Sequence, residues 1–314
     1  MGKLALLFAG QGAQHPGMCA DLVAGEPAAR AVFEMADAVR PGTSAQCLSG
    51  TAEQLAQTVN TQPCVFAADL ACARALAAHG VQPDLLAGFS LGEVAALTFA
   101  GAFSDEEGFS LACRRARLMD DASQRHPGQM RAVLKLEASE VERLAAQAGD
   151  AWPVNYNSPR QTVVAGLPDA LARLDELVRA ARGRSMRLAV SGAFHSPLMQ
   201  EASEGLAAYL AQGHAPGAPR VEVIANATAV PYPDDAGARA RLLARQVARP
   251  VQWVRTLELC RARGVDTFVE VGPGATLTGL VRRTLPGATA LPCEDAHQLE
   301  AVLAELFASG GERS

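Results

Sequence analysis

The segment Gly88-Phe89-Ser90-Leu91-Gly92 has the spacing of a nucleophile elbow, in which a serine attacks an acyl carbon. It follows a short apolar run and precedes a stretch with helical character. Both glycines are expected because a Cβ at either position would clash with the neighbouring strand or helix. The N-terminus of the following helix would direct N–H groups toward the reacting carbonyl. The pattern predicts a catalytic serine, and an ordinary glycine-rich turn is the alternative.

A serine nucleophile needs a base, and the chain offers six histidines. His195 is favoured because it lies where the chain leaves its middle segment, and junctions of this kind often border clefts. His15 is the alternative, and a structural role for either residue also stays open. The others stand beside Gly or Pro in expected surface loops or in a charged stretch: His79, His126, His214 and His297.

The tetrahedral intermediate of acyl transfer needs two N–H donors. One is expected from Leu91, the residue after the nucleophile. Gly10-Gln11-Gly12, which follows the first strand candidate, is a natural source of the second. This segment lacks the spacing and the lysine of a phosphate-binding P-loop, so nucleotide binding is disfavoured. A purely structural turn is the alternative.

These motifs together resemble the malonyl-CoA:acyl carrier protein transacylases and the related acyltransferase domains of polyketide synthases. The resemblance extends over nearly the whole chain, with matching order and spacing. The matching segments are Phe8–Gln14, Pro16–Met18, Thr61–Pro63, Gly88–Glu93, Arg115 with Met119, Val154–Pro159, Phe194–Ser196, Pro250–Trp253 and Glu270–Gly274.

The resemblance implies a role for each matching residue. Ser90 would take the acyl group from CoA as an ester, and His195 would act as its base. A main-chain carbonyl near Gln252 would orient the imidazole in place of a carboxylate. The N–H groups of Gln11 and Leu91 would form the oxyanion hole.

The resemblance also selects Arg115 as the cation that pairs with the free malonyl carboxylate. Arg114, Arg115 and Arg117 lie on one expected helix, where adjacent side chains point about 100° apart. At most one of them can therefore face a cleft. Gln62 and Asn155 match further motifs and are expected to line the substrate pocket.

Phe194, which precedes His195, resembles the motif of malonyl-selective polyketide acyltransferases. Its ring would fill the space that an α-methyl group needs. Two positions depart from the family pattern. Phe89 stands where the family most often has His, and Gln129 replaces a small residue before Met130.

The elements that must position these residues alternate between short apolar runs and helical stretches, which is typical of a parallel α/β sheet. Strands are expected at Leu4–Ala9, Leu85–Ala87, Val221–Ala225 and Thr267–Val271. Helices are expected at Ala52–Asn60, Cys64–His79, Glu93–Ala100, Asp105–Gln124, Leu198–Gln212, Ala236–Ala248 and Val254–Arg263.

The middle of the chain predicts a different arrangement, βαββαβ, as in ferredoxin-like folds. Its expected elements are Met130–Leu136, Ser139–Ala148, Trp152–Asn157, Thr162–Ala165, Leu167–Ala181 and Met186–Val190. The predicted architecture is thus an α/β, hydrolase-like parallel-sheet subdomain (residues 1–127 and 192–314). A ferredoxin-like subdomain (128–191) is inserted into it. The 314 residues also suggest two domains, at about 150 residues each.

Composition excludes several classes of protein. Hydrophobic residues make up 49% and charged residues 19%, which is typical of a globular protein. The 28 Lys and Arg against 33 Asp and Glu give a net charge of −5, which disfavours binding to nucleic acid. No apolar run is long enough for a membrane span, and the first ten residues predict a buried strand rather than a signal peptide. The seven cysteines lack CxxC pairs and zinc-ligand spacing, so we expect reduced thiols, no metal and a cytoplasmic location.

The resemblance therefore implies a cofactor-independent, monomeric acyltransferase. It would move malonyl from malonyl-CoA through a serine ester to the phosphopantetheine thiol of an acyl carrier protein, in ping-pong fashion. The product would supply fatty-acid or polyketide synthesis. An acidic carrier would need a basic patch, and arginines within 179–187 or 239–249 could supply one.

Other functions stay open from the sequence. A malonate decarboxylase subunit would perform the same malonyl transfer. An acyl-thioester hydrolase would need an acid between Ser90 and His195, such as Asp120 or Asp121. A carrier-docking subunit without catalytic activity is disfavoured by the Ser90 and His195 motifs.

Overall fold

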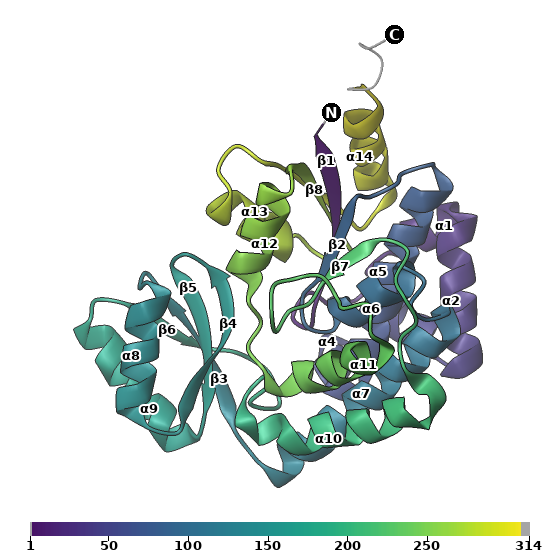
Figure 1. The fold of residues 1–314 in the computed structure, drawn as a ribbon. Helices are drawn as coiled ribbons and strands as arrows, with labels where there is room; N and C mark the ends of the chain where they lie inside the picture. The colour runs from purple at the N-terminus through teal and green to yellow at the C-terminus, as the bar shows by residue number, and fades with distance from the viewer. Residues whose placement is uncertain (1, 309–314) are drawn as a thin grey trace. The chain divides into compact units, whose positions relative to one another are not determined.

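A five-stranded sheet runs through the part of the chain that carries Ser90, and all its neighbouring strands are parallel (Figure 1). The computed structural model describes residues 2–308. The strand order is β7-β2-β1-β8-β9, with bounds β1 (Lys3–Phe8), β2 (Leu85–Gly88), β7 (Glu222–Ile224), β8 (Val265–Val271) and β9 (Thr289–Cys293).

The register of this sheet places the turns that follow β1, β2 and β8 at the same edge. Phe8 at the end of β1 pairs with Gly88 of β2 and with Val271 of β8. Parallel strands buried on both faces read as continuous apolar runs, which explains why β1 and β2 were predictable. The turns that follow β1, β2 and β8 all begin at this carboxyl edge, where open α/β sheets usually bind ligands.

Helices pack on this sheet, and the longest of them, α5 (Thr58–Ala78), is buried along most of its length. The predicted break between two helices after Asn60 is wrong, because α4 (Ala52–Leu55) ends earlier and α5 continues through Pro63. Proline removes one helical hydrogen bond, and the burial of α5 offsets that loss. The other helices here are α1 (Ala20–Gly25), α2 (Pro27–Val39), α3 (Thr43–Ser49), α6 (Gly92–Phe99), α13 (Thr276–Thr284) and α14 (Ala296–Ala308).

A separate four-stranded antiparallel sheet has the order β4-β5-β3-β6, which confirms the ferredoxin-like prediction. Its core joins apolar residues of the strands to those of two helices, including Val133, Leu144 and Leu171. The elements are β3 (Gln129–Leu134), α8 (Ala138–Ala148), β4 (Ala151–Ser158), β5 (Gln161–Gly166), α9 (Pro168–Ala180) and β6 (Arg184–Arg187).

Strand β6 lies earlier in the chain than the predicted Met186–Val190. Its pairing with β3, from Leu134↔Arg184 to Arg131↔Arg187, sets its position. The strand is at an exposed edge of the sheet and is polar. An apolar pattern is therefore a poor guide to it.

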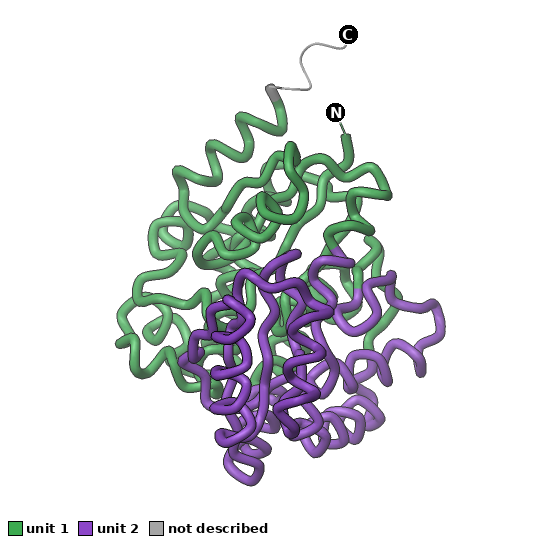
Figure 2. The backbone as a smooth tube through the Cα atoms, turned by 90° about the vertical axis from the view of Figure 1, so that its left-hand side faces the viewer, with its two compact units in different colours: residues 1–113, 216–224, 257–314 green, residues 114–215, 225–256 purple. Residues whose placement is uncertain are grey.

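The chain divides into two compact units, which Figure 2 colours separately. The first comprises residues 1–113, 216–224 and 257–314, as far as these are described, and contains the parallel sheet. The second comprises residues 114–215 and 225–256, so it is larger than the predicted insertion of 128–191. Besides the antiparallel sheet it holds most of α7 (Asp105–Arg125), η1 (Pro197–Met199), α10 (Gln200–Tyr209), η2 (Leu210–His214), α11 (Ala236–Arg245), η3 (Gln246–Ala248) and the start of α12 (Trp253–Ala262).

Two absences hold for residues 2–308. None of their helices is both long and apolar enough to cross a bilayer. No disulfide joins their cysteines, and all but Cys113 are buried.

Candidate active site

Ser90 stands on a sharp turn between β2 and α6, in the first unit. Its φ of 54° lies in the left-handed region, which residues other than glycine rarely adopt. Strained backbone of this kind is concentrated at functional sites, and it is the geometry of a nucleophile elbow. The local structure thus presents the Ser90 side chain at the carboxyl edge of the parallel sheet.

The two glycines that flank this turn are needed for the reason expected from the sequence. A Cβ on Gly88 would overlap the backbone of Gly92, and a Cβ on Gly92 would overlap the carbonyl oxygen of Phe8. The Phe89 N–H also donates to the Phe8 oxygen at 2.9 Å. The elbow is therefore packed directly against the end of β1.

The Gly10–Gly12 turn continues from that same end of β1. It closes with a hydrogen bond from the Ala13 N–H to the Gly10 oxygen at 3.3 Å, and Gly12 has a φ of 109°. A Cβ on Gly10 would lie 2.5 Å from the Phe89 oxygen, so this turn touches the elbow. Backbone contact thus couples the two segments that carry the expected oxyanion donors, Gln11 and Leu91.

Helix α5 holds the side chain of Gln11, whose Nε2 donates to Thr58 Oγ1 at 3.2 Å. Gln62 lies one helical turn after Thr58 and is only 1% exposed. The first unit therefore groups Gln11, Gln62, Ser90 and Leu91 around the carboxyl edge of its sheet.

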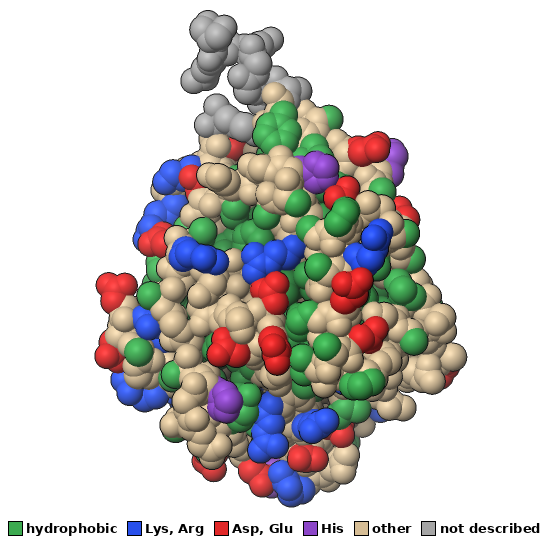
Figure 3. All heavy atoms as spheres, turned by 90° about the vertical axis from the view of Figure 1, so that its right-hand side faces the viewer, with side chains coloured by type: hydrophobic (Ala, Val, Ile, Leu, Met, Phe, Trp, Pro, Cys, Tyr) green, Lys and Arg blue, Asp and Glu red, His purple; other side chains and the backbone are tan. Residues whose placement is uncertain are grey.

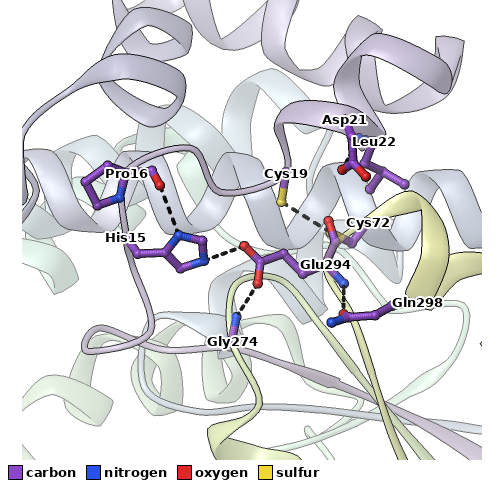
Figure 4. A network of polar contacts seen from close by, with 9 residues as sticks. All are labelled: His15, Pro16, Cys19, Asp21, Leu22, Cys72, Gly274, Glu294 and Gln298. Carbon is purple, nitrogen blue, oxygen red and sulfur yellow. Dashed lines mark hydrogen bonds and ion pairs between the residues drawn. The ribbon is translucent and has the colours of Figure 1, made fainter.

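His15, the alternative base, is engaged in another network (Figure 4). Its Nε2 lies 2.5 Å from Glu294 Oε1, and its Nδ1 lies 3.1 Å from the Pro16 oxygen. The second oxygen of Glu294 accepts the Gly274 N–H at 2.8 Å. Since both ring nitrogens have partners, this histidine anchors the loop after Gln11 and is a poor candidate for the base.

His195 is buried in the second unit, with 3% exposure and a φ of 62°. Its main-chain N–H donates to the Val247 oxygen at 2.9 Å. Its Nδ1 lies 3.0 Å from the Gln246 oxygen and 3.1 Å from the Arg249 oxygen. Two carbonyl acceptors fix the proton on Nδ1, which makes Nε2 the nitrogen that can act as a base.

The two acceptors, the carbonyl oxygens of Gln246 and Arg249, lie six and three residues before Gln252, near which a carbonyl acceptor was expected. The Gln252 N–H donates to the Asn226 oxygen at 2.8 Å. The short η3 helix ends at Ala248 and turns the Gln246 and Arg249 carbonyls toward the imidazole. Residue spacing alone did not reveal this turn.

Burial lowers the pKa of His195 to about 4, and the nearby charge of Arg115 acts in the same direction. The Gln246 and Arg249 carbonyls oppose this shift, because they stabilise the protonated ring. The imidazole is therefore neutral at pH 7 and ready to accept a proton.

Arg115 is 2% exposed, whereas its neighbours Arg114 and Arg117 are exposed. This confirms that only one arginine of the cluster faces inward. Its Nη2 donates to Gln246 Oε1 at 2.9 Å. Gln246, which sequence reasoning missed, thus contacts Arg115 through its side chain and His195 through its main chain.

Two further expected residues also lie in the second unit. Asn155 is 8% exposed on β4 and pairs with Val251, the residue before Gln252. Phe194 is 6% exposed, and its ring lies against Gly192, where a Cβ would come within 3.2 Å of it. Asn155 and Phe194 thus lie in the same compact unit as His195 and Gln246.

The expected residues therefore fall into two groups. The first unit holds a serine on an elbow with adjacent backbone donors, and the second holds a neutral imidazole beside a buried cation. Across residues 2–308 no cluster of three or more His, Cys, Asp and Glu side chains could hold a metal ion. These are the groups needed for acyl transfer through a serine ester.

Comparison with known proteins agrees with this chemistry. The family model described as "Acyl transferase domain" matches residues 5–302, so the chain belongs to that family and is an acyltransferase.

Its relatives include the malonyl CoA-acyl carrier protein transacylase of Salmonella typhimurium. That protein is 35% identical over 311 residues, which cover 97% of this chain and 100% of the relative. The crystal structure of the Clostridium perfringens transacylase has a TM-score of 0.93 at 32% identity, with 98% of each chain covered. A type II polyketide malonyl-transacylase, PlMCAT, solved with its acyl carrier protein AntF, has a TM-score of 0.92 at 34% identity, covering 96% of this chain and 99% of its own.

Proposed function

We propose that this protein transfers a malonyl group from malonyl-CoA to the phosphopantetheine thiol of an acyl carrier protein. The proposal rests chiefly on the surroundings of Arg115. Its guanidinium is buried, donates a hydrogen bond to Gln246 and lies near His195, the candidate base. A guanidinium presents a planar set of N–H donors that matches a carboxylate group. The free carboxylate of malonyl is such a group. The similarity to malonyl-transacylases supports the same substrate.

In the first half-reaction, Ser90 Oγ attacks the thioester carbonyl while its proton passes to His195 Nε2. The N–H groups of Leu91 and Gln11 stabilise the oxyanion of the tetrahedral intermediate. When the C–S bond breaks, His195 returns the proton to the sulfur of CoA. The products are free CoA and a malonyl ester on Ser90.

The second half-reaction reverses these roles. The carrier-protein thiol gives its proton to His195, and its sulfur attacks the ester carbonyl. The Ser90 oxygen leaves and regains the proton from His195, which restores the free enzyme. No step requires a bound cofactor or a metal ion.

Acyl selectivity follows from the groups around the malonyl unit. Arg115 pairs with its carboxylate in surroundings from which water is largely excluded, where a charge pair is stronger than in bulk solvent. Phe194 fills the volume that an α-methyl branch would need. Gln62 and Asn155 are further residues that we expect to contact the substrate.

Two alternative functions, an acyl-thioester hydrolase and a malonate decarboxylase subunit, differ from this proposal in the partner of His195 or in the acyl acceptor. A hydrolase triad would use a carboxylate on His195 Nδ1, but that nitrogen faces the carbonyl oxygens of Gln246 and Arg249. Of the candidate acids, Asp120 instead accepts from Gln124 at 2.8 Å. A malonate decarboxylase subunit would form the same malonyl ester and would differ only in the carrier that receives it.

The acyl carrier is the expected protein partner, as in the PlMCAT complex. Carriers of this kind are acidic, and the chain itself has a net charge of −5, so docking needs a local basic surface. On the face drawn in Figure 3, cationic and anionic side chains are interspersed. Four exposed arginines lie in or close to β6 and are candidates for such a surface: Arg179, Arg182, Arg184 and Arg187. We further expect the enzyme to act as a cytoplasmic monomer.

Intact-mass spectrometry with a panel of acyl-CoAs, with and without holo carrier protein, tests this function. The expected result is one malonyl adduct that stays on the enzyme alone and moves to the carrier when the carrier is added. Rapid hydrolysis of malonyl-CoA without carrier would favour the hydrolase alternative. Equal labelling by malonyl and acetyl groups would contradict the role of Arg115.

A further inference from the structure

Helix α5 carries a carboxyl group in the interior of the first unit. Asp69 is 0% exposed, and the residues around it on the helix are mostly apolar. Neither of its carboxyl oxygens has a hydrogen-bond partner of good geometry among the described residues. A buried polar group with so little compensation is costly, and such groups require an explanation.

The Asp69 carboxyl is wedged against the turn that follows β8. A Cβ on Gly272 would overlap Asp69 Oδ1, and it would also lie 3.2 Å from the Cβ of Ala9. Gly272 has a φ of 107°, which further restricts the position to glycine. The carboxyl group therefore fills the space left between the ends of β1 and β8.

Ala9 links this carboxyl group to the candidate active site. The Ala9 N–H donates to the Val271 oxygen at 3.2 Å, so the ends of β1 and β8 are joined. A Cβ on Gly92 would lie 2.5 Å from the Ala9 oxygen. Asp69 thus contacts one side of the segment whose other side supports the Ser90 elbow and which leads directly to Gln11.

The charges around Asp69 favour its neutral form. Burial raises the pKa of Asp69 well above its ordinary value, and Cys72 and Glu270 act in the same direction while the Ala9 N–H opposes them. Glu270 is also buried, but its oxygens accept the Leu277 and Thr278 N–H groups at 2.9 and 2.7 Å. Burial raises the pKa of Glu270 as well, and these bonds at the start of α13 oppose that shift. On Asp69 only the Ala9 N–H opposes it.

We propose that Asp69 is a positioning residue that holds the Phe8–Gln11 segment against the nucleophile elbow and so fixes the spacing of the two oxyanion donors. It touches neither substrate nor reacting atoms. The Glu294 network with His15 and Gly274 anchors the far end of the same loop (Figure 4). Asp69 is the corresponding anchor at its beginning. The inference rests on the proposed function only in taking Gln11 and Leu91 as the oxyanion donors.

The test measures the rate at which acyl-CoA acylates Ser90, for malonyl-CoA and acetyl-CoA separately. Asp69→Ala should lower the acylation rate about 10-fold or more, with KM changed less than about twofold, because oxyanion donors act in the transition state. The loss should be equal for both acyl groups, since the thioester carbonyl is common to them. Asp69→Asn keeps the size and neutrality of the group and should stay within about threefold of the wild type.

Asp84→Asn is the matched control, since Asp84 accepts the Leu4 N–H at the opposite end of β1. It should leave both rates unchanged. Gly272→Ala is a second variant that should displace the Asp69 carboxyl group, because the added Cβ would overlap it. This variant should also slow both substrates equally, and it keeps the test open if Asp69→Ala does not fold.

The proposal is overturned if folded Asp69→Ala or Gly272→Ala acylates at the wild-type rate. A loss confined to malonyl-CoA, a loss that appears in KM, or an Asp69→Asn variant as slow as Asp69→Ala would overturn it equally. Failure of the proposed function would be recognised separately. In that case the wild type itself would form no malonyl adduct or would show no preference for malonyl over acetyl.

Discussion

Gln246 hydrogen-bonds both to His195 and to the cation beside it. Its main-chain oxygen lies 3.0 Å from His195 Nδ1, and its side-chain Oε1 accepts from Arg115 at 2.9 Å. Gln246 therefore helps to orient both the guanidinium and, together with Arg249, the imidazole. The side-chain amide also contacts Asn226 Oδ1 at 3.4 Å, which limits its rotation.

This arrangement makes Gln246→Glu an informative substitution. A carboxylate at this position would pair with Arg115 and compete with the malonyl carboxylate for it. We expect malonyl loading to fall roughly 10-fold or more, with acetyl loading changed far less. The His195 contact should survive because it uses the main chain.

Single-turnover labelling with each acyl-CoA measures both rates, and Gln147→Glu at an exposed site of the same unit is the control. Equal losses for the two substrates would show that Gln246 does not act through Arg115.

The low pKa of His195 predicts an unusual acid limb in the pH profile. With acetyl-CoA, whose acyl group does not titrate, the acylation rate should be constant from about pH 5 to 8. It should fall only near pH 4, as His195 takes up a proton. An acid limb near the ordinary histidine value of about 6.5 would contradict the buried, cation-flanked environment.

The stability of the fold should follow the same titration with a definite sign. Between about pH 6.5 and 4 the unfolded chain binds the His195 proton and the folded chain does not. Folding stability should therefore decrease as the pH falls through this window.

The charge of Arg115 also opposes protonation of His195. Arg115→Gln should therefore move the acid limb of the acylation rate to higher pH. An unmoved limb would remove Arg115 from the electrostatics of the base.

Arg115→Ala tests carboxylate recognition directly. Malonyl loading should fall roughly 100-fold, because a buried charge-assisted pair is lost, while acetyl loading should fall much less. The comparison uses acylation rates for the two CoA esters on the same preparation. Arg117→Ala, an exposed change on the same helix, should alter neither rate. If Arg115→Ala reduces both substrates alike, its role is structural.

Carrier docking can be separated from chemistry by charge reversal around β6. Arg184→Glu with Arg187→Glu should raise KM for an acidic carrier protein roughly 10-fold at low salt, and high salt should reduce the difference. Acylation by malonyl-CoA alone should not change. Arg143→Glu, on an exposed face of α8, serves as the control. A carrier KM that does not respond would locate the docking surface elsewhere on the protein.

The sequence predicted the central strands of the parallel sheet and the strand and helix order of the antiparallel one, because these patterns are regular. Strands β1 and β2 are continuous apolar runs, and the βαββαβ order follows from alternating strand and helix periods. No helix or strand was predicted for residues 20–49 or 275–308, which form α1–α3, α13, β9 and α14. Helix α2 (Pro27–Val39) begins at a proline and buries Ala29, Val32, Phe33 and Ala36 at helical spacing, so its pattern could have been read from the sequence.

The sequence predicted those site residues whose role only one or two residue types can perform. The glycines around Ser90 could be argued from sterics. Helical geometry allowed at most one inward arginine, and only the family resemblance selected Arg115. The partners of His195 could not be predicted, because main-chain carbonyls leave no mark in the residue types that carry them. Gln246 and Asp69 were missed for a related reason: their importance lies in contacts between segments 131 and 203 residues apart, respectively, in the chain.

The central claim is that Ser90 carries the malonyl group as an ester. Intact-mass spectrometry of the protein after brief exposure to malonyl-CoA tests it most directly, with Ser90→Ala as the matched variant. The expected result is one malonyl adduct on the wild type, which disappears when holo carrier protein is added, and no adduct on Ser90→Ala. A malonyl adduct that persists on Ser90→Ala, or a wild type that transfers malonyl without ever carrying it, would contradict the account.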